Sequence, residues 1–455
     1  MRALLALAWP IVIARASQAV VGFCDALMTA RLGEDQLAAV TTGALNVFYV
    51  AILPMGVVFI VQSFASQLKS KGDMVAARRY AWYGLMLTAL TAVLAACTIP
   101  LIGPIIGLFG FSAGVAGHMT DYMSIRMLSL GAFIGVEVIG NWYGGLGNTR
   151  LHMVAGVGAM VFNVFLNWVL IYGNLGAPAL GVEGAAWASV AASWIAFAFI
   201  LTVFLRRAWF DDDDATGKLA LRMDEFKRML RFGLPNGFNW FLEFSAFIIF
   251  MNIVVAHLGT TVLAAMMVVF NINSVSFMPA FGLSSAGAIL VGQAIGADRH
   301  DDVSGILKRT VMVAAIWQGT VGLLYVAIPA VLMGWFAPDD APSSAEMLKL
   351  GTTMLMISAA WQLFDSLGMA VSETLRAAGD TTWCLYARLV VAWVIFVPGS
   401  LLTIFVFGGG HISAMIWLVI YLGVLSVVFL WRFRRGAWRD IDLTGVEKSM
   451  MPDVT

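Results

Sequence analysis

Apolar segments long enough to cross a membrane recur along nearly the whole chain. A helix needs about 20 apolar residues to span a hydrocarbon core about 30 Å thick. Of the 455 residues, 60% are hydrophobic and 12% are charged, whereas soluble globular domains carry about 25% charged residues. The segments lack the strict alternation that outer-membrane strands require. The sequence therefore predicts an all-α membrane protein and excludes a water-soluble fold.

About twelve such segments can be counted, and each is expected to form one transmembrane helix. Basic residues lie mainly in alternate connections and in the C-terminal tail. By the positive-inside rule, this pattern places both termini in the cytoplasm, which requires an even number of spans. A bacterial-type inner (plasma) membrane is the expected location. The expected spans lie near residues 3–30, 36–66, 78–107, 116–143, 150–173, 181–206, 229–258, 262–293, 305–336, 346–375, 382–407 and 411–431.

The chain contains two similar halves on either side of a polar stretch in its middle. Short anchors in the first half recur in the second in the same order, at offsets of about 225 to 232 residues. Shared use of leucine, alanine and glycine explains any one of these matches, but not four in order. The anchors are Pro10 with Pro235, Leu32-Gly33 with Leu258-Gly259, Pro54 with Pro279, and Gly147 with Gly379.

Six helices per half give both repeats the same orientation in the membrane. Parallel repeats of this kind are related by an axis along the membrane normal, with a central cleft that rocking exposes to each side in turn. We expect an N-terminal six-helix bundle over residues 1–210 and a C-terminal six-helix bundle over 229–435. A cytoplasmic linker over 211–228, with the acidic run Asp211–Asp214, and a cytoplasmic tail over 436–455 complete the division.

Three carboxylates lie inside the apolar segments: Asp25, Glu243 and Asp365. A charge at the bilayer centre costs between about 3 and more than 10 kcal/mol, so such residues are candidates for a functional site. No lysine or arginine lies within one helical turn of any of them along the chain. Acids without an internal base suit a small cation, a proton or a cationic ligand.

Several motifs around these acids resemble the multidrug and toxic compound extrusion (MATE) family, in particular its NorM-like branch. The resemblance covers essentially the full length. It is strongest in Gly22–Gly33, in Phe232-Gly-Leu-Pro235 through Glu243, and in Thr374–Thr381. It implies a fold of two six-helix bundles related by a pseudo-two-fold axis. It also implies export of organic cations and amphiphilic compounds in exchange for Na⁺ or H⁺.

The resemblance places a polar pair of the fifth helix at Asn163 and Asn167, one turn apart. With Asp25 and Ser189, this pair is expected to form an oxygen-rich, cation-coupling set. Hard cations such as Na⁺ favour these oxygens. A proton is an equally good candidate for the coupling ion, because burial disfavours the charged form of a carboxyl group. The alternatives are an interfacial acid at Asp25 and ordinary inter-helix hydrogen bonding by the asparagines.

The acids of the seventh and tenth helices, Glu243 and Asp365, complete the predicted cation-coupling residues. If sodium is the coupling ion, Asp25, Glu243 and Asp365 are its expected ligands. An aromatic or methionine side chain lies one turn from each of the two C-terminal acids. Such rings bind organic cations, and methionine tolerates varied ligand shapes. The expected substrate-binding residues are Glu243, Asp365, Trp240, Phe247, Trp361 and Met369.

Two features distinguish the aromatic residues of this chain from the set that the family resemblance implies. Trp361 stands where the family resemblance leads us to expect a tyrosine, which removes one hydroxyl ligand. Many of the other aromatic residues are expected to face lipid or the membrane interface.

Glu137 is expected to pair across helices with Arg15 as a structural salt bridge, whereas the roles of Arg126 and Glu373 stay open.

The patterns together predict a secondary active multidrug efflux transporter that works by antiport through alternating access. The alternative is a lipid-linked oligosaccharide or other lipid flippase of the same fold superfamily, which would need a cationic cavity. No phosphate loop, metal motif or nucleophile elbow is present in the sequence, so neither an enzyme nor a cofactor is expected. The net charge of zero gives no signal for nucleic acid. The expected partners are drugs and membrane lipid, and a monomer is expected.

Overall fold

The structure, a computed structural model, describes residues 1–206, 220–336 and 342–445. All regular elements in these ranges are helical. Eleven helical runs are long and apolar enough to cross a membrane, and one bent pair of helices raises the number to twelve. The predicted all-α fold with about twelve spans is therefore confirmed. The acidic run Asp211–Asp214 and the end of the expected tail, 446–455, lie outside the described residues.

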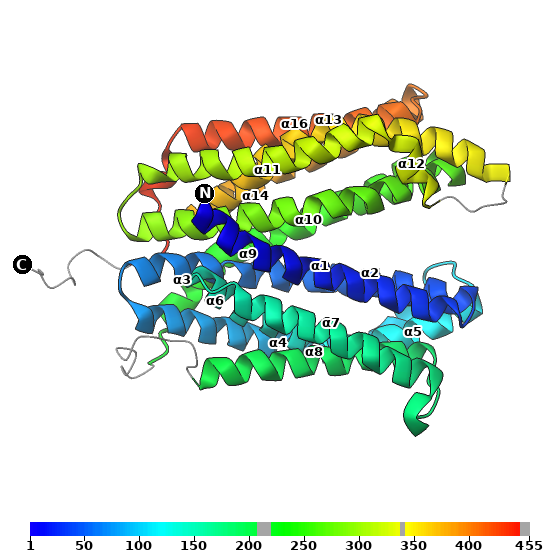
Figure 1. Ribbon diagram of the computed structural model, residues 1–455, viewed down its shortest axis with the longest axis horizontal. Helices are drawn as coiled ribbons and strands as arrows, with labels where there is room; N and C mark the ends of the chain where they lie inside the picture. The colour runs from blue at the N-terminus through cyan, green and yellow to red at the C-terminus, as the bar shows by residue number, and fades with distance from the viewer. Residues whose placement is uncertain (207–219, 337–341, 446–455) are drawn as a thin grey trace, which may run out of the picture.

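The helices form two groups that lie side by side (Figure 1). Helices α1 and α10 contact each other between the groups, as do α2 and α9. The first group consists of α1 (Arg2–Ala30), α2 (Glu34–Phe59), α3 (Val61–Ser70), α4 (Met74–Ile106), α5 (Ala113–Met127), α6 (Leu130–Gly145), α7 (Arg150–Tyr172) and α8 (Val182–Leu205). The second group consists of α9 (Met223–Ile249), α10 (Thr260–Gly296), α11 (Asp302–Ala327), α12 (Pro329–Gly334), α13 (Pro342–Ala378), α14 (Thr381–Val390), α15 (Val397–Leu401) and α16 (His411–Arg434).

Short segments with other hydrogen-bonding patterns extend or connect these helices. Three π-helical segments extend spans of the second group, and two 3₁₀ turns lie outside the spans. The π-helical segments are η3 (Phe250–Val255), η4 (Val391–Phe396) and η5 (Leu402–Val406), and the 3₁₀ turns are η1 (Asn174–Gly176) and η6 (Ala437–Asp440).

The span expected as one helix near 116–143 is instead a bent pair, α5 and α6, with an angle of 45° between them. The Ser129 hydroxyl at the break donates to the carbonyl oxygen of Arg126 at 2.6 Å. It also accepts a hydrogen bond from the Arg126 guanidinium at 3.1 Å. A serine hydroxyl that bonds back to the preceding turn competes with the helical ladder and bends the helix. The segment is thus one bent span, and counting the pair as one gives the expected twelve.

The two groups approach each other closely where α2 crosses α9 at a pair of glycines. A Cβ atom added to Gly56 would lie 2.8 Å from the Cα of Gly237, and one added to Gly237 would lie 2.7 Å from the carbonyl oxygen of Leu53. Beside this crossing, the Asn236 amide donates to the carbonyl oxygen of Gly56 at 2.6 Å. Small residues let helix backbones approach closely in a membrane. The glycines therefore determine how tightly α2 and α9 can pack.

A second contact between the groups is built around Arg376 of α13. Its guanidinium lies over the ring of Phe59, 4.3 Å from the centroid, and donates to Gln62 at 2.9 Å and Ser63 at 3.1 Å. Glu373 is its counter-ion at 2.5 Å. The contact joins the last turns of α13 to the junction of α2 and α3. Glu373, whose role the sequence left open, thus supports an inter-helix contact.

The expected pair between Arg15 of α1 and Glu137 of α6 is confirmed. Two nearly parallel hydrogen bonds of 2.8 and 2.9 Å join the guanidinium to the carboxylate, and Glu137 is fully buried. The amide groups of Gln18 and Asn141 each donate to Glu137 at 3.2 Å. The Nε2 atom of His152 on α7 lies 3.7 Å from the same carboxylate. This cluster joins α1, α6 and α7 and satisfies a charge that would otherwise be buried alone.

We predict that Gly237→Val lowers the thermal unfolding midpoint of the purified protein in detergent. The added methyl groups meet backbone atoms of α2 that cannot move aside independently, and overpacking of this kind costs about 1–3 kcal/mol. The matched control is Gly158→Val in α7, because a Cβ atom there meets nothing within 4 Å. Equal midpoints for the two variants would contradict the close crossing of α2 and α9.

We also predict that Arg15→Met destabilises the protein much more than the double variant Arg15→Met, Glu137→Met. Removing one partner leaves a buried charge unpaired, at a cost of about 3–5 kcal/mol, whereas replacing both with apolar side chains is often nearly neutral. Thermal unfolding of both variants and of Glu137→Met gives the coupling energy. Additive losses would show that the two side chains do not form a coupled pair.

Candidate ion and substrate site

The structure brings the four predicted cation-coupling residues of the first helix group together around Asp25. Asp25 on α1 is 5% exposed. Asn167 donates to its Oδ1 atom at 2.5 Å, and Ser189 donates to its Oδ2 atom at 3.3 Å. Asn163 donates to Ser189 at 2.9 Å and accepts from Asn167 at 3.2 Å. The two asparagines face Asp25 together because residues four apart lie on one side of α7.

This cluster is rich in oxygen atoms and leaves one of them without a partner. The Oδ1 atom of Asn167 is buried and has no hydrogen bond. A buried polar atom without a partner costs about 1–3 kcal/mol. Carboxylate, amide and hydroxyl oxygens are the ligands that hard cations prefer. Arg126 of α5 interacts with Asp25 electrostatically, which the sequence did not predict.

The second candidate region lies between α9 and α14, where Glu243 is paired with a base. Arg388 of α14 forms a salt bridge with Oε1 of Glu243. The Tyr421 hydroxyl of α16 donates to the same oxygen at 3.4 Å. The interpretation of Glu243 as an acid without an internal base was therefore wrong. The partner comes from another helix, whereas the sequence argument considered only neighbours within one turn.

Asp365 of α13 accepts a hydrogen bond from Gln318 of α11 at 2.9 Å. The Gln318 side chain is 1% exposed, and its Oε1 atom has no hydrogen-bond partner. The charges of Glu243 and Arg388 both act on Asp365, so the three groups form one electrostatic unit. Sequence reasoning missed Gln318 and Arg388. The available signal was that each is a polar side chain inside an apolar span.

The predicted aromatic residues divide into two sets. Trp361 of α13 stacks on Phe270 of α10 with ring centroids 6.2 Å apart, and Phe247 of α9 meets Phe270 edge-on at 4.7 Å. Trp240 instead packs against Phe59 of α2 at 5.0 Å. Phe247 and Trp361 thus share a cluster in the second helix group, whereas Trp240 contributes to the contact between groups. Met369 is partly buried on α13.

Neither region gathers a cluster of metal-ligating side chains. Among the residues that the structure describes, no three His, Cys, Asp or Glu side chains gather in a way that could hold a metal ion. A sodium ion at Asp25 or Asp365 would therefore rely on neutral oxygens for its other ligands.

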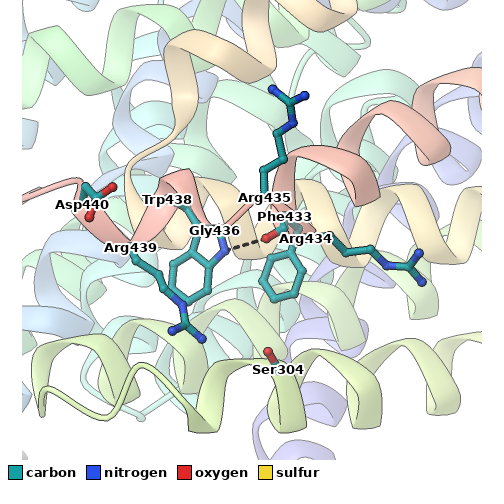
Figure 2. Close-up of a pocket in the computed structure, with 8 residues that line it drawn as sticks. All are labelled: Ser304, Phe433, Arg434, Arg435, Gly436, Trp438, Arg439 and Asp440. Atoms are coloured by element: carbon teal, nitrogen blue, oxygen red, sulfur yellow. Dashed lines mark hydrogen bonds between the residues drawn. The ribbon is translucent and has the colours of Figure 1, made fainter.

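A surface hollow lies elsewhere, beside the C-terminal end of α16 (Figure 2). Its lining includes Arg434, Arg435 and Arg439, whose guanidinium groups point in different directions in Figure 2. Trp438 donates to the carbonyl oxygen of Phe433 at 3.0 Å within it. None of the predicted site residues lines this hollow.

Curated relatives align with almost the whole chain. A probable multidrug resistance protein NorM from Pseudomonas putida is 27% identical over 445 residues, covering 96% of this chain and 95% of the relative. The multidrug resistance protein NorM of Burkholderia vietnamiensis is 28% identical over 433 residues, covering 94% and 92%.

Solved structures share the fold. A multidrug resistance MATE family transporter of the MOP superfamily, solved in an outward-facing conformation, matches with a TM-score of 0.88 at 20% identity and covers 96% of each chain. A MOP superfamily transporter from Pyrococcus furiosus matches with the same TM-score at 19% identity, again over 96% of each chain.

The family comparison matches the chain twice. The MatE family model aligns with residues 10–169 and again with residues 235–402. The second match begins 225 residues after the first, in agreement with the tandem repeat read from the sequence anchors. Since the two matches together cover well over half of its length, the chain belongs to the MatE family.

Proposed function

We propose that this protein is a secondary active efflux transporter that exports organic cations and amphiphilic compounds by antiport with Na⁺ or H⁺. The observation that carries the proposal is the shell around Asp25. This carboxylate is almost fully buried, contacts two neutral side chains, and lies beside the unpartnered Asn167 oxygen. A site of this composition accepts a small cation or a proton and has little use in a static scaffold.

The cargo is inferred from the second region. The Glu243 side chain is 41% exposed and lies on the same helix as Phe247, whose ring contacts Phe270 beside Trp361. Carboxylates and aromatic rings together attract organic cations through Coulomb and cation–π interactions. The NorM relatives are named multidrug resistance proteins, which supports drugs as the cargo.

Exchange requires that ion and cargo favour different conformations. In this proposal, a cation from outside neutralises Asp25 or the Glu243–Asp365 region and favours an outward-open state that releases the drug. The Arg376 contact joins the helix groups at the start of α3, the helix that leads into the α3–α4 connection with Lys71. The positive-inside rule assigns that connection to the cytoplasm.

The flippase alternative requires free positive charge for a pyrophosphate group. Three of the buried arginines, Arg15, Arg376 and Arg388, are each paired with a glutamate. Paired bases are less available to an anionic ligand, because binding it would leave the glutamate without its counter-ion. This pairing favours a cationic cargo.

We predict that ethidium efflux from cells or inside-out vesicles depends on an imposed Na⁺ or pH gradient. The triple variant Asp25→Asn, Glu243→Gln, Asp365→Asn is expected to lose this dependence, with efflux reduced about tenfold or more, as for a coupling energy of a few kcal/mol. The control is Asp35→Asn, an exposed acid at the start of α2.

Separate Na⁺ and pH gradients identify the coupling ion in the same experiment. Undiminished efflux by the triple variant would contradict the role of these acids. Absence of transport under either gradient, with the wild-type protein folded in the membrane, would favour the flippase.

A second prediction isolates the Asp25 shell. Asn167→Leu removes one donor to Asp25 and the unpartnered oxygen. If Na⁺ is the coupling ion, the Na⁺ concentration that half-saturates efflux should therefore rise about tenfold or more, as for loss of a ligand-supporting group. Asn271→Leu is the control, because Asn271 is an exposed asparagine on α10 that bonds only its own helix backbone. An unchanged half-saturating Na⁺ concentration or pH would remove Asn167 from the ion site.

A further inference from the structure

A buried arginine at a candidate binding site for organic cations calls for a physical explanation. Arg388 is 7% exposed, while the side chain of its partner Glu243 is 41% exposed. The guanidinium lies 5.8 Å from the ring centroid of Phe429 on α16, and its buried Nε atom has no hydrogen bond. The arginine is thus enclosed by helices, and the Glu243 carboxylate is the accessible member of the pair.

The pair changes the charge that a ligand meets. Glu243, Arg388 and Asp365 interact electrostatically, and their formal charges sum to a single negative charge. Without Arg388, the two carboxylates Glu243 and Asp365 would give the site a net charge of two negative charges. Arg388 and Tyr421 both contact the Oε1 atom of Glu243, so a cation that approaches this carboxylate meets a fixed positive charge beside it.

Asp365 differs from Glu243 in this respect. Its contact with Gln318 is to a neutral amide, and the Oε1 atom of that amide is unpartnered. The hydrogen-bond partner of Asp365 is therefore neutral, whereas Glu243 is directly paired with Arg388.

We propose that Arg388 is a specificity-determining residue, an internal counter-ion that limits the site to one net negative charge and so selects monovalent over divalent organic cations. The inference rests on the proposed function, since it assigns a cargo preference to the same site. A like charge placed next to a ligand discriminates by repulsion, which is a common basis of specificity.

The test compares two probes with the same phenanthridinium ring. Ethidium carries one positive charge, and propidium carries a second on a quaternary ammonium group. Equilibrium binding of each to the purified full-length protein is measured by fluorescence anisotropy for the wild type and for Arg388→Gln. We expect the ratio of propidium to ethidium affinity to rise about tenfold in the variant, the effect of removing one like charge from a partly desolvated site.

Two further variants separate charge from packing. The double variant Arg388→Gln, Glu243→Gln restores one net negative charge and should return the ratio to the wild-type value. Arg388→Lys keeps the charge and should leave the ratio near that of the wild type. The control is Arg432→Gln, which breaks an arginine–carboxylate pair with Asp380 elsewhere in the second helix group and should not change the ratio.

An unchanged ratio in Arg388→Gln would overturn the inference, and so would a raised ratio that persists in the double variant. Wild-type protein that binds neither probe would also overturn it. Efflux assays with the same variants address the proposed function separately. A shifted binding ratio without any gradient-driven efflux would support the role of Arg388 and reject antiport. Gradient-driven efflux with an unchanged ratio would support antiport and reject the role of Arg388.

Discussion

A charge that lies within the hydrocarbon region must find its partner inside the protein, because lipid offers none. This constraint explains the main polar contacts of the structure. Arg15 pairs with Glu137, Arg376 with Glu373 and Arg388 with Glu243. The first and third pairs each join two helices, and Arg376 also bonds Gln62 and Ser63 across the boundary between the helix groups. The buried charges therefore help to specify which helices lie together.

Asp25 and Asp365 are the exceptions, and their surroundings are chemically alike. Each carboxylate accepts a hydrogen bond from a carboxamide, Asn167 in one case and Gln318 in the other. In both cases the oxygen of that carboxamide is buried without a partner. The two sites are built from different helices, α1 with α7 and α11 with α13. The hydrogen-bond partners of both carboxylates are thus neutral, while Arg126 and Arg388 act on Asp25 and Asp365, respectively, through electrostatics alone.

The packing between the helix groups combines tight and polar contacts. Glycines at the α2–α9 crossing bring the backbones together, and the Arg376 contact adds hydrogen bonds at the start of α3. The alternating access that we propose requires the polar contact to open. Hydrogen bonds to Gln62 and Ser63 suit this role, because water can replace them when the helices separate.

The sequence by itself determined the all-α membrane fold, the number of spans and the tandem repeat. The i, i+4 spacing also placed Asn163 and Asn167 on one face of a helix, without knowledge of its neighbours. The expectation that this face meets Asp25 and Ser189 depended on the family resemblance. Only the tertiary structure decided that Arg388 neutralises Glu243, that Gln318 bonds Asp365, and that the span before α7 is bent at Ser129. Periodicity shows which side of a helix is polar. Which helix faces that side depends on contacts between residues far apart in the chain, and those arise from the packing of all the helices together.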